Sequence, residues 1–80
     1  MNWREHIQTD PAVLLGKPVI KGTRLAVDFI IERLANGWTE NQLLENYPRL
    51  TREDLNAVFA YIHECMQDGL LFDAQSKITS

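Results

Sequence analysis

Two signals for the start of a helix lie close together in the second half of the chain, with a proline between them. Thr39 is followed three positions later by Gln42, and Thr51 is followed in the same way by Asp54. In each pair the side chains accept hydrogen bonds from free backbone N–H groups, which fixes the first turn of a helix. Pro48 disfavours helical geometry at the residue before it, so the first helix ends after about two turns. The pattern predicts a short helix, a tight turn and a third, longer helix.

Apolar spacing places another helix before this pair. Val27, Ile30, Ile31 and Leu34 recur at helical intervals, and Asn36–Gly37 follows as an end signal, so a helix is expected over about 26–36. The last helix ends at Asp68–Gly69. Its apolar stripe is expected to comprise Leu55, Val58, Phe59, Ile62 and Met66.

The N-terminal part of the chain is interrupted by glycine and proline, so it predicts short strands and turns, with Leu14–Leu15 and Val19–Ile20 as the apolar runs. The expected fold is mainly α, with a short N-terminal β segment followed by a three-helix helix-turn-helix bundle. We expect one domain over residues 1–80, divided into a β segment (1–25), a three-helix unit (26–66) and a tail (67–80).

Composition narrows the class of protein. With 45% apolar residues among 80, one core can form, but it is small enough that a second copy or a partner is expected to add stability. The single Cys65 cannot form an intrachain disulfide, and no apolar run is long enough for a signal peptide or a membrane span. We therefore expect a cytoplasmic protein that does not enter a membrane.

Enzymatic and metal-binding chemistry finds little support. The only serines, Ser76 and Ser80, lie in the tail, where nothing would hold a base beside them. His63 and Cys65 are two positions apart on a helix, so their side chains point in nearly opposite directions. Two histidines are too few and too separated for a zinc site. We expect no catalytic residue, no metal and no cofactor.

Charge is unevenly distributed. Residues 11–27 carry three cations and no acid, whereas residues 38–80 carry seven acids against three cations, and the whole chain has a net charge of −3. This balance disfavours a simple DNA-binding protein. If DNA is bound, the phosphate contacts are expected from the cations without a neighbouring acid, and Asn56 is expected to reach a base. These cations are Lys17, Lys21, Arg24, Arg49 and Arg52.

Several of these segments together resemble domain-of-unknown-function family 433. The most specific part runs from Gly16 to Arg24 (GKPVIKGTR), and Tyr47–Pro48 and the Leu50–Thr51 helix start add to it, over about residues 5–66. The resemblance implies a small bacterial protein with a homeodomain-like or winged-helix-like helix-turn-helix. It also implies a VapB-like antitoxin whose gene neighbours a PIN-like ribonuclease toxin, with no catalytic residues. Family members commonly have proline where this chain has Ala26, which affects where the first helix begins.

Two surfaces are expected to contact other proteins. Ala57 and Ala60 are placed on an exposed face of the last helix, where small side chains would let another helix approach. Leu70, Leu71 and Phe72 need cover, either by folding back on the domain or by docking into a toxin. Trp3 and Phe29 lie off the main apolar stripes, which favours a homodimer that uses the β segment.

Three functions remain open from the sequence. The first is an antitoxin that binds a toxin and represses its own operon as a dimer. The second is a plain DNA-binding regulator, and the third is a protein-interaction module with the same fold and no affinity for DNA. The acidic C-terminal half favours the first over the second.

Overall fold

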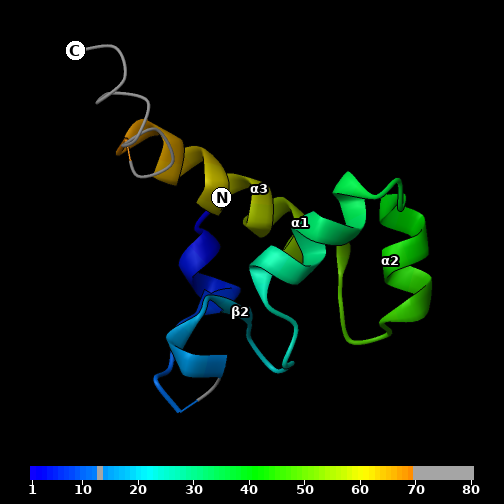
Figure 1. Ribbon diagram of the computed structural model, residues 1–80, viewed down its shortest axis with the longest axis horizontal. Coiled ribbons are helices and arrows are strands. Elements are labelled where there is room, and N and C mark those ends of the chain that lie inside the picture. The colour runs from blue at the N-terminus through cyan, green and yellow to red at the C-terminus, as the bar shows by residue number, and fades with distance from the viewer. Residues whose placement is uncertain (13, 70–80) are drawn as a thin grey trace.

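The computed structural model describes residues 1–12 and 14–69 (Figure 1). The fold is mainly helical, with a short two-stranded sheet near the N-terminus, as predicted. In chain order its elements are η1 (Trp3–Glu5), β1 (Ile7–Gln8), η2 (Leu14–Gly16), β2 (Val19–Ile20), α1 (Val27–Ala35), α2 (Glu40–Asn46) and α3 (Arg52–Gln67).

The helix ends follow from local sequence. Thr39 caps α2 and exchanges hydrogen bonds with Gln42, and Thr51 caps α3 and exchanges them with Asp54, so both predicted capping boxes are confirmed. Gly37 ends the first helical segment with a φ of 95°, a conformation that glycine adopts at low cost. The turn after α2 closes through a hydrogen bond from the Leu50 N–H to the Tyr47 carbonyl, at 2.9 Å.

The β segment consists of short strands and turns, as predicted. β1 and β2 pair antiparallel, with Ile7 opposite Ile20, so the strand at Val19–Ile20 is confirmed. Leu14–Leu15 forms one of the expected turns and not a strand. Both leucines lie in the left-handed region, with φ of 48° and 58°, and Gly16 continues there at 82°. The chain has to reverse between β1 and β2, and this turn overrides the β propensity of the apolar pair.

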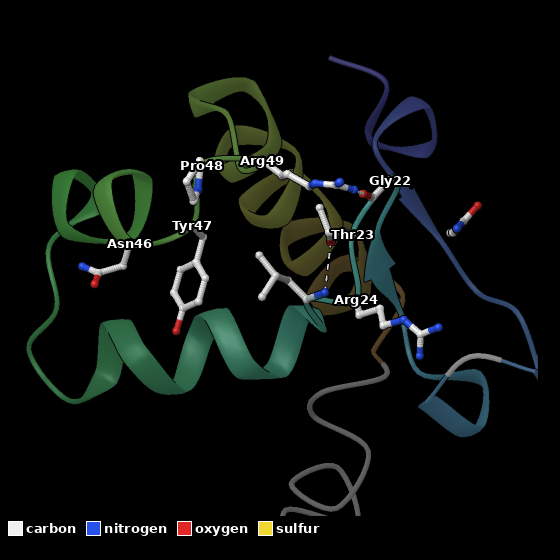
Figure 2. A pocket seen from close by; sticks show the side chains of 9 residues that line it. Gly22, Thr23, Arg24, Asn46, Tyr47, Pro48 and Arg49 are labelled. Atoms are coloured by element: carbon white, nitrogen blue, oxygen red, sulfur yellow. Dashed lines mark hydrogen bonds between the residues drawn. The ribbon is translucent and has the colours of Figure 1, made fainter.

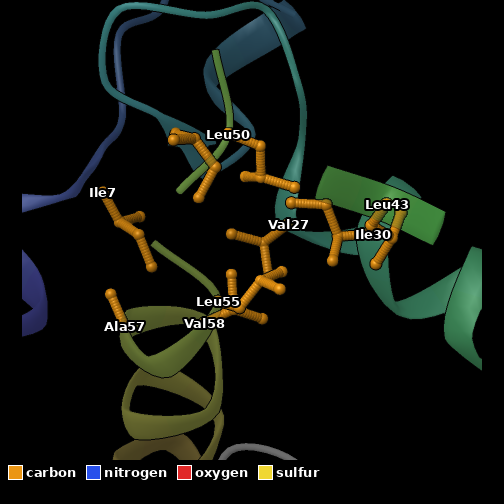
Figure 3. Close-up of a cluster of buried hydrophobic side chains, with 9 residues drawn as sticks. Ile7, Val27, Ile30, Leu43, Leu50, Leu55, Ala57 and Val58 are labelled. Atoms are coloured by element: carbon orange, nitrogen blue, oxygen red, sulfur yellow. The ribbon is translucent and has the colours of Figure 1, made fainter. Parts of the chain in front are cut away.

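The core lies where the β segment, α1, α2 and the first half of α3 meet (Figure 3). Ile30 from α1, Leu43 from α2 and Leu55 from α3 are fully buried there. Strand β2 adds Ile20, which lies across the sheet from Ile7. Both strands and all three α-helices therefore contribute to one cluster, whereas the leucines of η2 are exposed.

The N-terminal segment packs against α3, far along the chain (Figure 1). The Trp3 ring meets the Tyr61 ring edge-on, with centroids 4.8 Å apart, and the guanidinium of Arg4 lies 3.1 Å from Glu64. The residues of α3 that receive these contacts share one face of the helix with Ala57. The segment therefore covers a face of α3 that the apolar stripe alone would leave exposed.

Candidate functional site

The predicted cations differ in whether an acid neutralises them. The Lys17 amine lies 3.2 Å from the Asp28 carboxylate at the start of α1. Arg52 donates to the Asn41 side chain at 3.0 Å and lies 3.7 Å from Glu40. The expectation that these two cations lack a neighbouring acid was therefore wrong, because the fold brings them against the first turns of α1 and α2.

Three cations have no acid partner within residues 1–12 and 14–69. Lys21, Arg24 and Arg49 are exposed and take part in none of the ion pairs there. Arg49 donates to the Gly22 carbonyl at 3.3 Å, so its guanidinium reaches from the α2–α3 turn to the loop after β2 (Figure 2). Two segments that are distant in sequence thus form one basic site.

A pocket of about 740 Å³ lies between these two segments. Its walls are residues 22–25 of the loop before α1 and residues 46–49 of the turn after α2, with Gln8 at its edge. Arg24 and Arg49 both line it, whereas Asn56 of α3 does not. The structure therefore brings together two of the predicted DNA-binding residues and leaves the expected base-contacting residue elsewhere.

The prediction that Ala57 lies on an exposed face was wrong. Its exposed fraction is 0%, because η1 and β1 cover it, and it belongs to the hydrophobic core. Ala60, one step further around the helix, is half-buried. A small residue does allow another segment to approach α3 closely, but that segment is the N-terminus of the same chain. Ala57 is therefore unavailable to a partner, and Leu70, Leu71 and Phe72 lie outside the described residues.

The outer face of α3 carries large apolar side chains in place of the alanines. Phe59 and Met66 are 45% and 42% exposed, although the apolar stripe predicted them as core residues. Asn56 and His63 share this face with them, because the four positions recur at intervals of three and four residues. We call Asn56, Phe59, His63 and Met66 the α3 outer face. Because η1 packs against the opposite side of α3, the α3 outer face points toward solvent.

The aromatic residues that were expected at a dimer interface have partners within the chain. Phe29 meets Tyr47 edge-on at 5.7 Å, and Tyr47 stacks near Trp38 at 6.3 Å. The guanidinium of Arg33 lies 4.5 Å from the Phe29 ring centroid and 5.5 Å from that of Trp38. These contacts join α1 to the end of α2 and hold the Tyr47 ring in place beside the pocket. Trp3 is likewise packed against Tyr61.

Metal-ligating side chains do not gather in the part of the chain that is described. There, no three residues among His, Cys, Asp and Glu come close enough to hold a metal ion. Burial raises the pKa of the Tyr61 phenol, and a hydrogen bond with the Cys65 thiol raises it further. This pair lies one turn apart on α3, away from the basic pocket, so it belongs to the packing of the helix. Within the described residues no helix has the length and apolar content to cross a bilayer.

Comparison with known proteins identifies the family to which the chain belongs. The model of the family described as "Protein of unknown function (DUF433)" matches residues 7–62. A crystal structure of a DUF433 member from Anabaena variabilis is similar, with 35% sequence identity and a TM-score of 0.68. The match covers 86% of this chain and 65% of that protein, so this chain spans about two thirds of its relative's length. No curated protein matches the chain.

Proposed function

Since this chain belongs to the DUF433 family of proteins of unknown function, we propose its function from its own surfaces, as an antitoxin-type protein that binds a PIN-like ribonuclease toxin. The α3 outer face is the proposed contact with the toxin. The homeodomain-like and VapB-like assignments that the family resemblance implies are part of the same proposal.

The exposure of Phe59 and Met66 on one helix face carries this proposal. Each side chain leaves more than a third of its surface in water, where covering it would be favourable by about 25 cal/mol per Å². Aromatic residues and methionine are enriched at the cores of protein interfaces. A helix that presents such residues at intervals of three and four positions is suited to docking in a groove of a partner.

DNA binding is the weaker candidate. Of the six residues expected to contact DNA, Lys17 and Arg52 already pair with carboxylates of this chain, and Asn56 lies beside exposed apolar side chains. The net charge of −3 also opposes approach to a polyanion. The main alternative to the antitoxin proposal is therefore a protein-interaction module without affinity for DNA. Such a module would use the same contact, the α3 outer face.

The test is co-purification with the product of an adjacent gene that encodes a PIN-like protein. We expect the wild-type chain to retain the toxin on a column, and the double variant Phe59→Ser, Met66→Ser to lose it. Glu45→Ser is the control, since Glu45 is an exposed residue on α2 and belongs to none of the proposed contacts. The far-ultraviolet circular dichroism of all three proteins should be the same.

Two outcomes would contradict the proposal. If the wild-type chain fails to retain the adjacent PIN-like protein, the antitoxin function is wrong. If the double variant binds as well as the wild type, the α3 outer face is not the contact, whatever the function.

A homodimer is also proposed. Leu14 and Leu15 project from the left-handed turn beside the β segment, with 44% and 96% of their surfaces exposed. The left-handed backbone of these two residues carries strain, and their apolar side chains are exposed to water. A second copy of the chain would bury these side chains, which would favour a dimer.

A further inference from the structure

The basic pocket is separate from the α3 outer face, and the proposed toxin contact does not use it. It lies between the loop of residues 22–25 and the turn of residues 46–49 (Figure 2). Its volume of about 740 Å³ falls within the roughly 300–1,000 Å³ that is typical of ligand-binding pockets. Its residues come from segments that the core holds at both ends, so its walls are formed before any ligand binds.

The charge of the pocket has one sign. Arg24 and Arg49 line it, and no aspartate or glutamate does. Lys21 is adjacent in the chain, and none of the three cations pairs with an acid within the described ranges. Arg49 uses a single N–H group on the Gly22 carbonyl, which fixes the direction of its guanidinium and leaves other donors available. In a protein of net charge −3 this is a local site for an anion.

Part of the lining is apolar, beside the polar side chains of Gln8, Thr23 and Asn46. Leu25 and Tyr47 are half-buried, and Pro48 completes the wall formed by the turn. The Tyr47 ring is held between Phe29 and Trp38, at centroid distances of 5.7 and 6.3 Å, so it offers a fixed surface. A ligand therefore needs both a negative group for the arginines and an apolar group for this surface.

We propose that this pocket binds an acidic peptide segment of another protein, in which a carboxylate is followed by a large apolar side chain. Carboxylates of the segment accept hydrogen bonds from Arg24 and from Arg49, and the apolar side chain packs against Leu25, Tyr47 and Pro48. A DNA phosphate would satisfy the arginines, but a phosphodiester brings no apolar group to the pocket wall. Phosphate contacts also require cations spread along a groove, whereas Arg24 and Arg49 are the only cations among the described residues that line this pocket.

Fluorescence anisotropy of a labelled peptide tests the proposal. The probe is a fluorescein-tagged peptide of sequence Ser-Glu-Phe-Glu-Phe-Ser, and its control carries glutamine in place of glutamate. We expect the glutamate probe to bind the full chain and the glutamine peptide to bind at least about tenfold more weakly, as loss of a charge-assisted hydrogen bond predicts. Equal binding of the two peptides would overturn the proposal.

Variants locate the site. Arg24→Gln should lower the affinity for the glutamate probe about tenfold. Arg24→Lys should cause an intermediate loss of affinity, because lysine keeps the positive charge but cannot form two parallel hydrogen bonds with a carboxylate. Arg52→Gln is the matched control, since it removes the same charge from an arginine that already pairs with Glu40. Unchanged binding in Arg24→Gln, or an equal loss in Arg52→Gln, would place the peptide elsewhere.

Two further measurements separate this site from its alternatives. A short DNA duplex that displaces the peptide, and whose binding is lost in Arg24→Gln, would overturn the peptide assignment in favour of a phosphate site. Phe59→Ser, Met66→Ser should bind the peptide as the wild type does. Failure of the toxin experiment therefore leaves this proposal standing, and failure of the peptide experiment leaves the toxin proposal standing.

Discussion

The Nδ1 atom of His6 lies 2.9 Å from the Oδ1 atom of Asp54, which joins the N-terminal segment to the first turn of α3. The other carboxylate oxygen of Asp54 accepts a hydrogen bond from the Thr51 N–H at 3.0 Å. One largely buried carboxylate therefore both caps a helix and anchors a segment that begins far away in the sequence.

Removing the Asp54 carboxylate should lower the free energy of unfolding more than removing the His6 imidazole. His6→Gln is expected to lower the free energy of unfolding by about 1 kcal/mol, the usual net contribution of one hydrogen bond. Asp54→Ala should lower it by about 2 kcal/mol, because the helix cap is lost as well. Urea unfolding of the two single variants and the double variant measures this. Strictly additive losses would show that the two side chains do not interact.

Enlarging Ala57 should destabilise the fold, because it lies under the N-terminal segment with no exposed surface. Ala57→Leu is expected to lower stability by about 1–3 kcal/mol through overpacking. Ala60→Leu is the matched control, and its half-buried position should make its effect smaller. Thermal unfolding followed by circular dichroism compares them. A melting temperature unchanged in Ala57→Leu would mean that η1 does not pack on α3 in solution.

Stability should fall in alkali through Tyr61. Its pKa is raised above the ordinary value of 10.0, mainly by burial, so the folded state holds the phenol proton more tightly than the unfolded chain does. This contribution is complete below about pH 10 and is lost as the pH rises through the higher pKa of the folded state. Urea unfolding on either side of pH 10 should therefore show a steeper loss in the wild type than in Tyr61→Phe. Parallel pH profiles would contradict this assignment.

The proposed homodimer should scatter light with twice the mass of one chain at micromolar concentration. Leu14→Ser with Leu15→Ser is expected to shift the protein toward the monomer without lowering its helical content, because both side chains are exposed within the chain. A wild-type protein that remains monomeric at this concentration would exclude the dimer.

The helices could be predicted from the sequence because their signals are local. The Thr39 and Thr51 caps, the stop before Pro48 and the glycine after α1 each act within a few residues, and the structure has all of them. The pair of short strands was only half predictable. Whether an apolar dipeptide is a strand or a turn depends on where the chain has to reverse, and Leu14–Leu15 reverses it.

The candidate sites were harder to predict because they depend on contacts between distant segments. A helical wheel of α3 alone predicts that Ala57 is exposed and Phe59 is buried. In the structure the N-terminal segment covers the Ala57 side, and Phe59 is 45% exposed. The ion pairs that neutralise Lys17 and Arg52 also come from other helices. The cations Arg24 and Arg49 were identified, but nothing local places them on opposite sides of one pocket.

The packing of the N-terminal segment on α3 has a consequence for synthesis on the ribosome. Arg4 and Glu64 form one of its contacts, so the segment made first has to wait for a helix that is translated after α1 and α2. Until then Trp3 and Ile7 have no α3 to pack against, and the nascent chain exposes them to chaperones. Folding of this domain therefore completes only when its first residues meet its longest helix, and a ribosome stalled before α3 would hold a chain that cannot close its core.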